Sequence, residues 1–248
     1  GRPRAVTALQ VGALVLKVPL SIWFGLGGAG IDAQGAAGCA AATVVVNTAM
    51  VGVALWLLRS QDLYRQHGIW HRLERPDIRR IGAFLRHGLP AGLAVTVEVT
   101  SFTLMALFIA RLGTVAAASH QIAANLAAVL YMMPLSLGIA TSARASYWRG
   151  AGQAASARMA AGTGLALAAG LAIGASAVVW ALHPTIASLY TAQRAVADSA
   201  QALLLCVAAY HVVDAVQAVS FFVLRSYRIT VAPLVVYGLM LWGMGLLG

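Results

Sequence analysis

The sequence predicts an all-α integral membrane protein with about seven transmembrane helices. Hydrophobic residues make up 60% of the chain, against about 45–50% in soluble proteins, and the mean hydropathy is +0.82. Only 10% of the residues are charged, and they are bunched between long apolar runs. In a water-facing fold they would be spread over the helix surfaces. The composition therefore excludes an ordinary soluble protein.

Seven apolar segments are each long enough to cross a bilayer. Crossing the hydrocarbon core takes about 20 mostly apolar residues in a helix, because every backbone polar group must be bonded internally. The segments lie at about 5–26, 36–58, 86–110, 117–142, 158–182, 200–224 and 229–248.

Basic residues alternate between the loops that join these segments. One set of loops holds Arg2, Arg4, the seven arginines between 59 and 86, Arg144, Arg149, Arg158, Arg225 and Arg228. The other set holds only Arg111 and Arg194. Because short loops rich in arginine stay on the cytoplasmic side, the N-terminus is expected to be cytoplasmic. The net charge of +10 is thus a topology signal and does not indicate a nucleic-acid partner.

The polar stretch from Arg59 to Arg86 divides the chain. It mixes arginine and histidine with Glu74 and Asp77, as expected of an interfacial linker that faces solvent and lipid headgroups. We therefore predict two parts, residues 1–75 with two spans and residues 76–248 with five.

Three fully charged residues fall near the middle of spans: Lys17, Glu98 and Asp214. A central Asp, Lys or Arg costs about 2.5–3.5 kcal/mol on insertion scales, so the three are expected to face a cavity or one another. Lys17 is the chain's only lysine, and it is interpreted as a cavity-lining residue, a counter-ion or a packing residue.

Glu98 and Asp214 lie midway along their spans and are expected at one depth, lining one cavity. Tyr210 and Gln217 stand four residues before and three after Asp214, which places all three on one helical face. Oxygen ligands with a carboxylate suit a cation or a proton. The alternative is that the two carboxylates only pair with donors such as Lys17 and lock helices together.

Several short motifs appear in a characteristic order. They are GLPAGLAVTVEVT at 88–100, LGT at 112–114, SHQIAAN at 119–125, MPLSLG at 133–138, YHVVDAVQ at 210–217 and LRSY at 224–227. In these motifs the chain resembles the multidrug and toxic compound extrusion (MATE) family, NorM-like branch. The resemblance covers helices five to eleven of that family's twelve-helix, two-lobe fold.

The resemblance implies a function and a site. Members export cationic amphiphilic drugs or dyes in exchange for sodium ions or protons, across the bacterial inner membrane and without a cofactor. Glu98, Tyr210 and Asp214 match the family's coupling-cation residues, with a sodium ion at Glu98 and Asp214 as the only implied metal. The chain is then a multi-pass fragment whose partners are the missing helices, the lipid bilayer and the drugs.

Two departures and two alternatives stand beside this resemblance. Ser226 follows Arg225 where the family has glycine, and Lys17 stands where a neutral polar residue is usual.

A seven-helix receptor is suggested only by the span count, and a retinal Schiff base would need a lysine in the last span. An intramembrane enzyme has only Ser119 beside His120 to support it. We therefore expect a transporter and not an enzyme.

Overall fold

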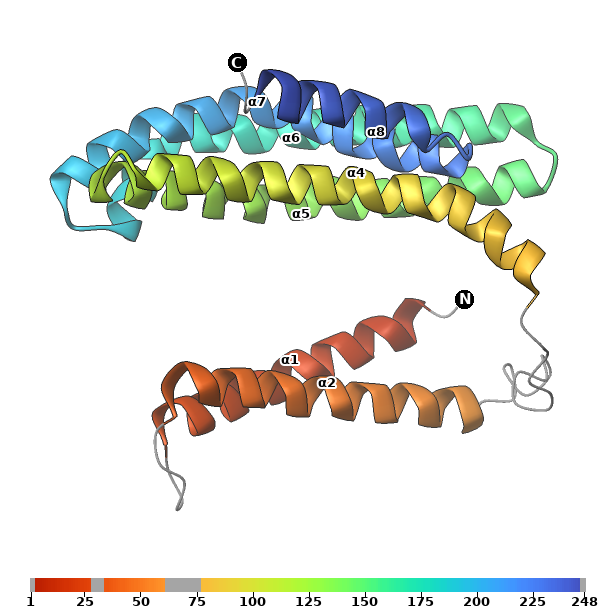
Figure 1. The fold of residues 1–248 in the computed structure, drawn as a ribbon, viewed down its shortest axis with the longest axis horizontal. Coiled ribbons are helices and arrows are strands. Elements are labelled where there is room, and N and C mark those ends of the chain that lie inside the picture. The colour runs from red at the N-terminus through yellow and green to blue at the C-terminus, as the bar shows by residue number, and fades with distance from the viewer. Residues whose placement is uncertain (1–2, 28–33, 61–76, 246–248) are drawn as a thin grey trace. The chain divides into compact units, whose positions relative to one another are not determined.

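The computed structural model describes residues 3–27, 34–60 and 77–245, and over these residues it is entirely helical (Figure 1). The elements are α1 (Pro3–Leu26), α2 (Gly35–Ser60), α4 (Ile78–Ala110), α5 (Thr114–Gly150), α6 (Ala154–Tyr190), α7 (Arg194–Ser226), α8 (Val231–Tyr237) and the π-helix η1 (Gly238–Met244). Six of them are long and apolar enough to cross a membrane, and Val231–Met244 is a shorter apolar stretch. The all-α membrane fold is confirmed, but six of the seven predicted spans correspond to helices of spanning length, and the seventh, 229–248, corresponds to the shorter stretch Val231–Met244 among the described residues.

The helices extend beyond the ends that hydropathy predicts. The predicted span 86–110 is part of the 33-residue α4, which at 1.5 Å per residue is about 50 Å long. The hydrocarbon core is only about 30 Å thick, so the helix ends carry polar residues that a hydropathy window does not count.

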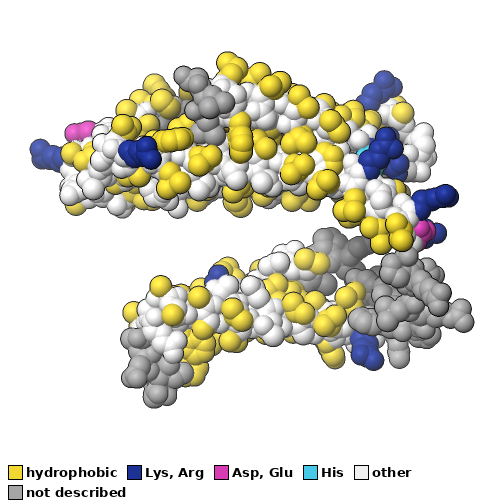
Figure 2. Space-filling model, viewed as in Figure 1, with side chains coloured by type: hydrophobic (Ala, Val, Ile, Leu, Met, Phe, Trp, Pro, Cys, Tyr) yellow, Lys and Arg dark blue, Asp and Glu magenta, His cyan; other side chains and the backbone are white. Residues whose placement is uncertain are grey.

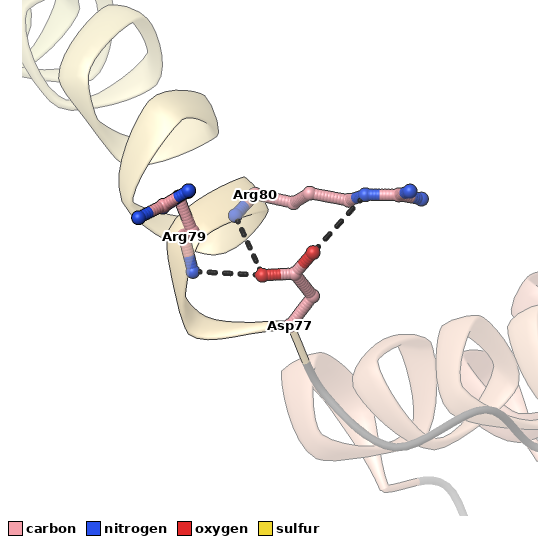
Figure 3. Close-up of polar contacts among 3 residues, drawn as sticks. All are labelled: Asp77, Arg79 and Arg80. Atoms are coloured by element: carbon pink, nitrogen blue, oxygen red, sulfur yellow. Dashed lines mark hydrogen bonds and ion pairs between the residues drawn. The ribbon is translucent and has the colours of Figure 1, made fainter.

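Asp77 fixes the beginning of α4 (Figure 3). Its carboxylate accepts hydrogen bonds from the backbone N–H groups of Arg79 at 2.9 Å and Arg80 at 3.2 Å. An ion pair of 3.1 Å joins the same carboxylate to the Arg80 side chain. This is an N-cap, which satisfies two backbone donors that the helix cannot bond internally. The rest of the predicted linker, residues 61–76, lies outside the described residues.

The chain divides into two compact units, Gly1–Pro76 and Asp77–Gly248. In the first unit α1 and α2 pack against each other. Gly38 of α2 faces the backbone of α1, where a Cβ would overlap the Phe24 carbonyl group. Only glycine allows the two helices to approach this closely.

In the second unit α7 packs along both α5 and α6. Small residues make these contacts possible: a Cβ on Gly138 would meet the Phe222 ring, and one on Gly164 would overlap the Thr141 side chain. The helices run through Pro90 and Pro134 without a break. Figure 2 shows hydrophobic side chains along the flank of this unit and Arg side chains near its ends, as expected for a bilayer-spanning bundle.

The helix α4 packs mainly against α8 and η1. The indole N–H of Trp242 in η1 donates to the Val97 carbonyl of α4 at 3.3 Å. The ring of Tyr237 in α8 stacks on Phe221 of α7, with ring centroids 5.7 Å apart. These contacts bring α4, α7 and α8 together at the level of residue 98.

Candidate functional site

Glu98 of α4 and Asp214 of α7 lie near each other in the second unit. Both side chains are partly buried, and their charges lie close enough to interact electrostatically. Each belongs to a helix long and apolar enough to span a membrane. The structure therefore brings together two of the acidic residues that the sequence singles out, from positions 116 residues apart.

Two tyrosines complete this cluster, and the sequence analysis does not find them. Tyr131 of α5 interacts electrostatically with both carboxylates. Tyr237 of α8 does the same, and it also interacts with the side chain of Gln217. The carboxylate cluster, defined as Glu98, Tyr131, Asp214, Gln217 and Tyr237, thus draws on four helices.

The residues around Asp214 face in two directions. Tyr210, one turn earlier, interacts electrostatically with Asp214 and is 45% exposed in the described structure. His211 also interacts with Asp214, but it is only 1% exposed. The helical period explains this difference, because adjacent residues on a helix point about 100° apart. Tyr210 and Gln217 therefore flank Asp214 on the open side of α7, and His211 points into the bundle.

Lys17 belongs to α1, in the unit of residues 1–76, and its side chain is exposed there. The carboxylate cluster is built from residues of the other unit. The predicted pairing of Lys17 with a carboxylate, and its place in a cavity, stay predictions.

Two grooves of the described structure have other linings. One lies between Asn125 and Tyr190, whose hydroxyl donates to the Asn125 side chain at 2.8 Å. The other lies between α5 and α7 near Arg225. A shared cavity around Glu98 and Asp214 likewise stays a prediction.

The cluster offers oxygen atoms as ligands. Two carboxylates, two phenol groups and one carboxamide are the groups that a hard cation such as sodium prefers. Among the described residues no group of three or more His, Cys, Asp or Glu could hold a metal ion. Chemically, such a set of oxygen atoms suits a proton, a sodium ion or an organic cation.

Comparison with known proteins places this geometry in a family context. The sequence model of the MatE family matches residues 90–247. The "Probable multidrug resistance protein NorM" of Aromatoleum aromaticum is 36% identical over 249 residues, covering 100% of this chain and 54% of that protein. The "Multidrug resistance protein PmpM" of Pseudomonas aeruginosa is 35% identical over 247 residues, covering 99% of this chain and 52% of that protein.

A solved structure has the same fold. The crystal structure of the eukaryotic MATE transporter AtDTX14 matches with a TM-score of 0.80 at 22% identity, over 96% of this chain and 55% of that one. The chain spans about half the length of the curated relatives it matches.

Proposed function

The chain belongs to the MatE family, and on that basis we propose that it forms part of a secondary multidrug efflux transporter. The proposed transporter exports organic cations, such as amphiphilic drugs and dyes, in exchange for sodium ions or protons. Relatives named as multidrug resistance proteins support this proposal. The receptor and intramembrane-enzyme alternatives lose their basis, because the fold is that of a MATE transporter.

One observation carries the coupling mechanism: Glu98 and Asp214 interact across two membrane-spanning helices. Two carboxylates close together repel each other, and the repulsion is stronger where water is scarce. A sodium ion or a proton between them relieves this repulsion. The hydroxyl groups of Tyr131 and Tyr237 add neutral oxygen ligands.

The same negative charge also attracts a cationic drug. Occupancy by the coupling ion then weakens drug binding, and by linkage the drug weakens ion binding to the same degree. An exchange cycle follows if the two occupied states prefer opposite orientations of the two lobes. In this proposal the remaining helices of the parent protein supply the second wall of the drug cavity.

The proposed location is the bacterial inner membrane, with the N-terminus of this chain in the cytoplasm. Basic side chains gather at the C-terminal ends of α5 and α7, as Arg149 and Arg225 illustrate, whereas the opposite end of the unit carries Arg111 and Arg194. This asymmetry supports the orientation that the positive-inside rule predicts.

The proposal is tested by the variants Glu98→Gln and Asp214→Asn in the full-length parent. Each removes one negative charge and keeps the side-chain size. Ion-driven dye efflux from energised cells should fall to background in both variants, at unchanged expression. Asp198→Asn is the matched control, because Asp198 is exposed in the first turns of α7. Normal efflux from both site variants would remove these residues from the mechanism.

The coupling ion is identified in the same cells. Efflux that follows an imposed sodium gradient and survives collapse of the proton gradient indicates sodium. The reverse result indicates a proton.

A further inference from the structure

A groove of about 370 Å³ lies between the C-terminal halves of α5 and α7. Ser142 and Ser146 of α5 line one wall, and Phe222, Arg225 and Ser226 of α7 line the other. Beside the groove, Gly138 of α5 packs closely against Phe222, since a Cβ there would lie 2.5 Å from the Phe222 ring. The groove lies in the half of the two helices that ends at Arg149 and Arg225.

The lining changes character along the groove. Ile139 and Phe222 form its inner part, and Ser146, Arg225 and Ser226 lie nearer the helix ends. Ile139 and Ser146 are separated by about 10 Å along α5 at 1.5 Å per residue. An apolar inner part and a polar, cationic outer part match an amphiphile whose charged group sits at the membrane surface.

Arg225 supplies an uncompensated positive charge at the groove. Its guanidinium lies 5.9 and 5.7 Å from the ring centroids of Phe221 and Phe222, and its residue is exposed. Among the described carboxylates, Asp77 pairs with Arg80, and none forms an ion pair with Arg225. No described carboxylate therefore neutralises Arg225, and its planar donor edge is suited to a phosphate group.

A purely structural role would account for a basic helix end, since arginines stabilise the negative ends of helix dipoles. Arg149 has such a role: it donates a hydrogen bond to the Ser226 carbonyl and lies 4.5 Å from the Tyr227 ring centroid. Its contacts hold the end of α5 to the end of α7. Arg225 likewise lies in the last turn of α7, but its guanidinium also lies beside the rings of Phe221 and Phe222, and Phe222 lines the groove.

Aromatic residues locate this end of the bundle at a membrane surface. Tyr147 is 65% exposed, and Trp148 lies beside it and beneath the Arg144 guanidinium. Tyr and Trp gather where the hydrocarbon meets the headgroups. A groove between spanning helices at that depth, with a free arginine, is the setting in which anionic headgroups bind.

We propose that this groove binds an anionic phospholipid, with the phosphate at Arg225 and Ser146 and the acyl chains along Ile139 and Phe222. The site shares no residue with the carboxylate cluster, so the proposal stands apart from the proposed ion coupling.

The test is native mass spectrometry of the purified 248-residue chain with phosphatidylglycerol and phosphatidylcholine of identical acyl chains. The wild type should bind phosphatidylglycerol in preference. Arg225→Gln should lower the affinity for phosphatidylglycerol about fivefold, because one arginine near an anionic surface contributes about that factor. Arg225→Lys keeps the charge and should retain most of the affinity. Arg158→Gln removes a charge from the exposed first turns of α6, outside the groove, and should leave the preference unchanged.

A second variant tests the groove rather than the charge. Ser146→Leu fills the opening without altering any charge and should weaken phosphatidylglycerol binding, while the helical circular dichroism stays that of the wild type. Equal phosphatidylglycerol binding by wild type, Arg225→Gln and Ser146→Leu would overturn the proposal. Competition by inorganic phosphate as effective as by the lipid would also overturn it, since the ligand would then be a free anion. The proposal would also be overturned if a longer parent protein, whose own helices cover the groove, lost the preference for phosphatidylglycerol.

Discussion

Glu98 and Asp214 each place a carboxylate in a helix whose other residues are mostly apolar. The free energy of such a group depends on what surrounds it, because charge is expensive in a medium of low dielectric constant. The tyrosine hydroxyls that interact with the pair add neutral polar oxygen atoms beside it. At the scale of single residues, the site is therefore a small set of oxygen atoms around two negative charges.

The hydroxyl group of Tyr131 should contribute to the affinity for the coupling ion. Tyr131→Phe keeps the ring and removes one oxygen close to both carboxylates. We expect the ion concentration that gives half-maximal dye efflux in the full-length parent to rise about tenfold, the usual value of a hydrogen bond to a charged group. Tyr147→Phe, at the exposed end of α5, is the control and should leave that concentration unchanged. An unchanged ion dependence in Tyr131→Phe would remove Tyr131 from the site.

The sequence reveals the acidic residues of the site but not the tyrosines. A carboxylate in an apolar run stands out because it is costly there, so Glu98 and Asp214 are detectable without a structure. Tyrosine is common in membrane helices, and nothing near Tyr131 or Tyr237 in the chain distinguishes them from packing residues. Only the packing of α5 and α8 around α4 and α7 brings their hydroxyl groups to the carboxylates.

Close packing of α5, α6 and α7 depends on particular glycines. Gly164 of α6 faces Thr141 of α5 without room for a Cβ, whereas Gly162, on the same helix, has no described atom within 4 Å of such a Cβ. The same substitution should therefore have opposite effects at two positions that are two residues apart.

Gly164→Ala should destabilise the bundle by about 1–3 kcal/mol, because overpacking forces the helices apart. Gly162→Ala should be neutral or stabilise it by up to about 1 kcal/mol, through the better helix propensity of alanine. Thermal unfolding in one detergent, followed by circular dichroism, measures both. Equal melting temperatures for the two variants would show that α5 and α6 do not meet at Thr141.

The existence of the helices is predictable from hydropathy, but their ends and the π-helical part of the last one are not. The α4 helix begins at an Asp77 cap well before its apolar run. The final segment changes from α8 to a π-helix at Gly238. This is a change of hydrogen-bonding pattern, which hydropathy does not detect. The Trp242 bond to the Val97 carbonyl then ties this π-helix to the turn that carries Glu98.

At the scale of the whole molecule, the proposal concerns the orientation of the chain in the membrane and the coupling between ion and drug. The loop between α6 and α7 and the loop between α5 and α6 lie at opposite ends of the second unit. The positive-inside rule puts the first outside and the second in the cytoplasm.

Single cysteines test this orientation in a parent protein whose Cys39 and Cys206 are replaced by alanine. Ala192→Cys, between α6 and α7, should react with a membrane-impermeant maleimide in intact cells. Ala151→Cys, between α5 and α6, should react only after permeabilisation. Both positions are exposed in the structure. The opposite labelling pattern would invert the topology.

The central claim is that Glu98 and Asp214 form one shared site, and a double-mutant cycle on ion-driven dye efflux tests it most directly. The rates of wild type, Glu98→Gln, Asp214→Asn and the double variant are compared in the full-length parent at equal expression. Residues that act as one unit give strongly non-additive effects, so each single variant should lose nearly as much activity as the double variant. Partial losses that simply add in the double variant would contradict the shared site.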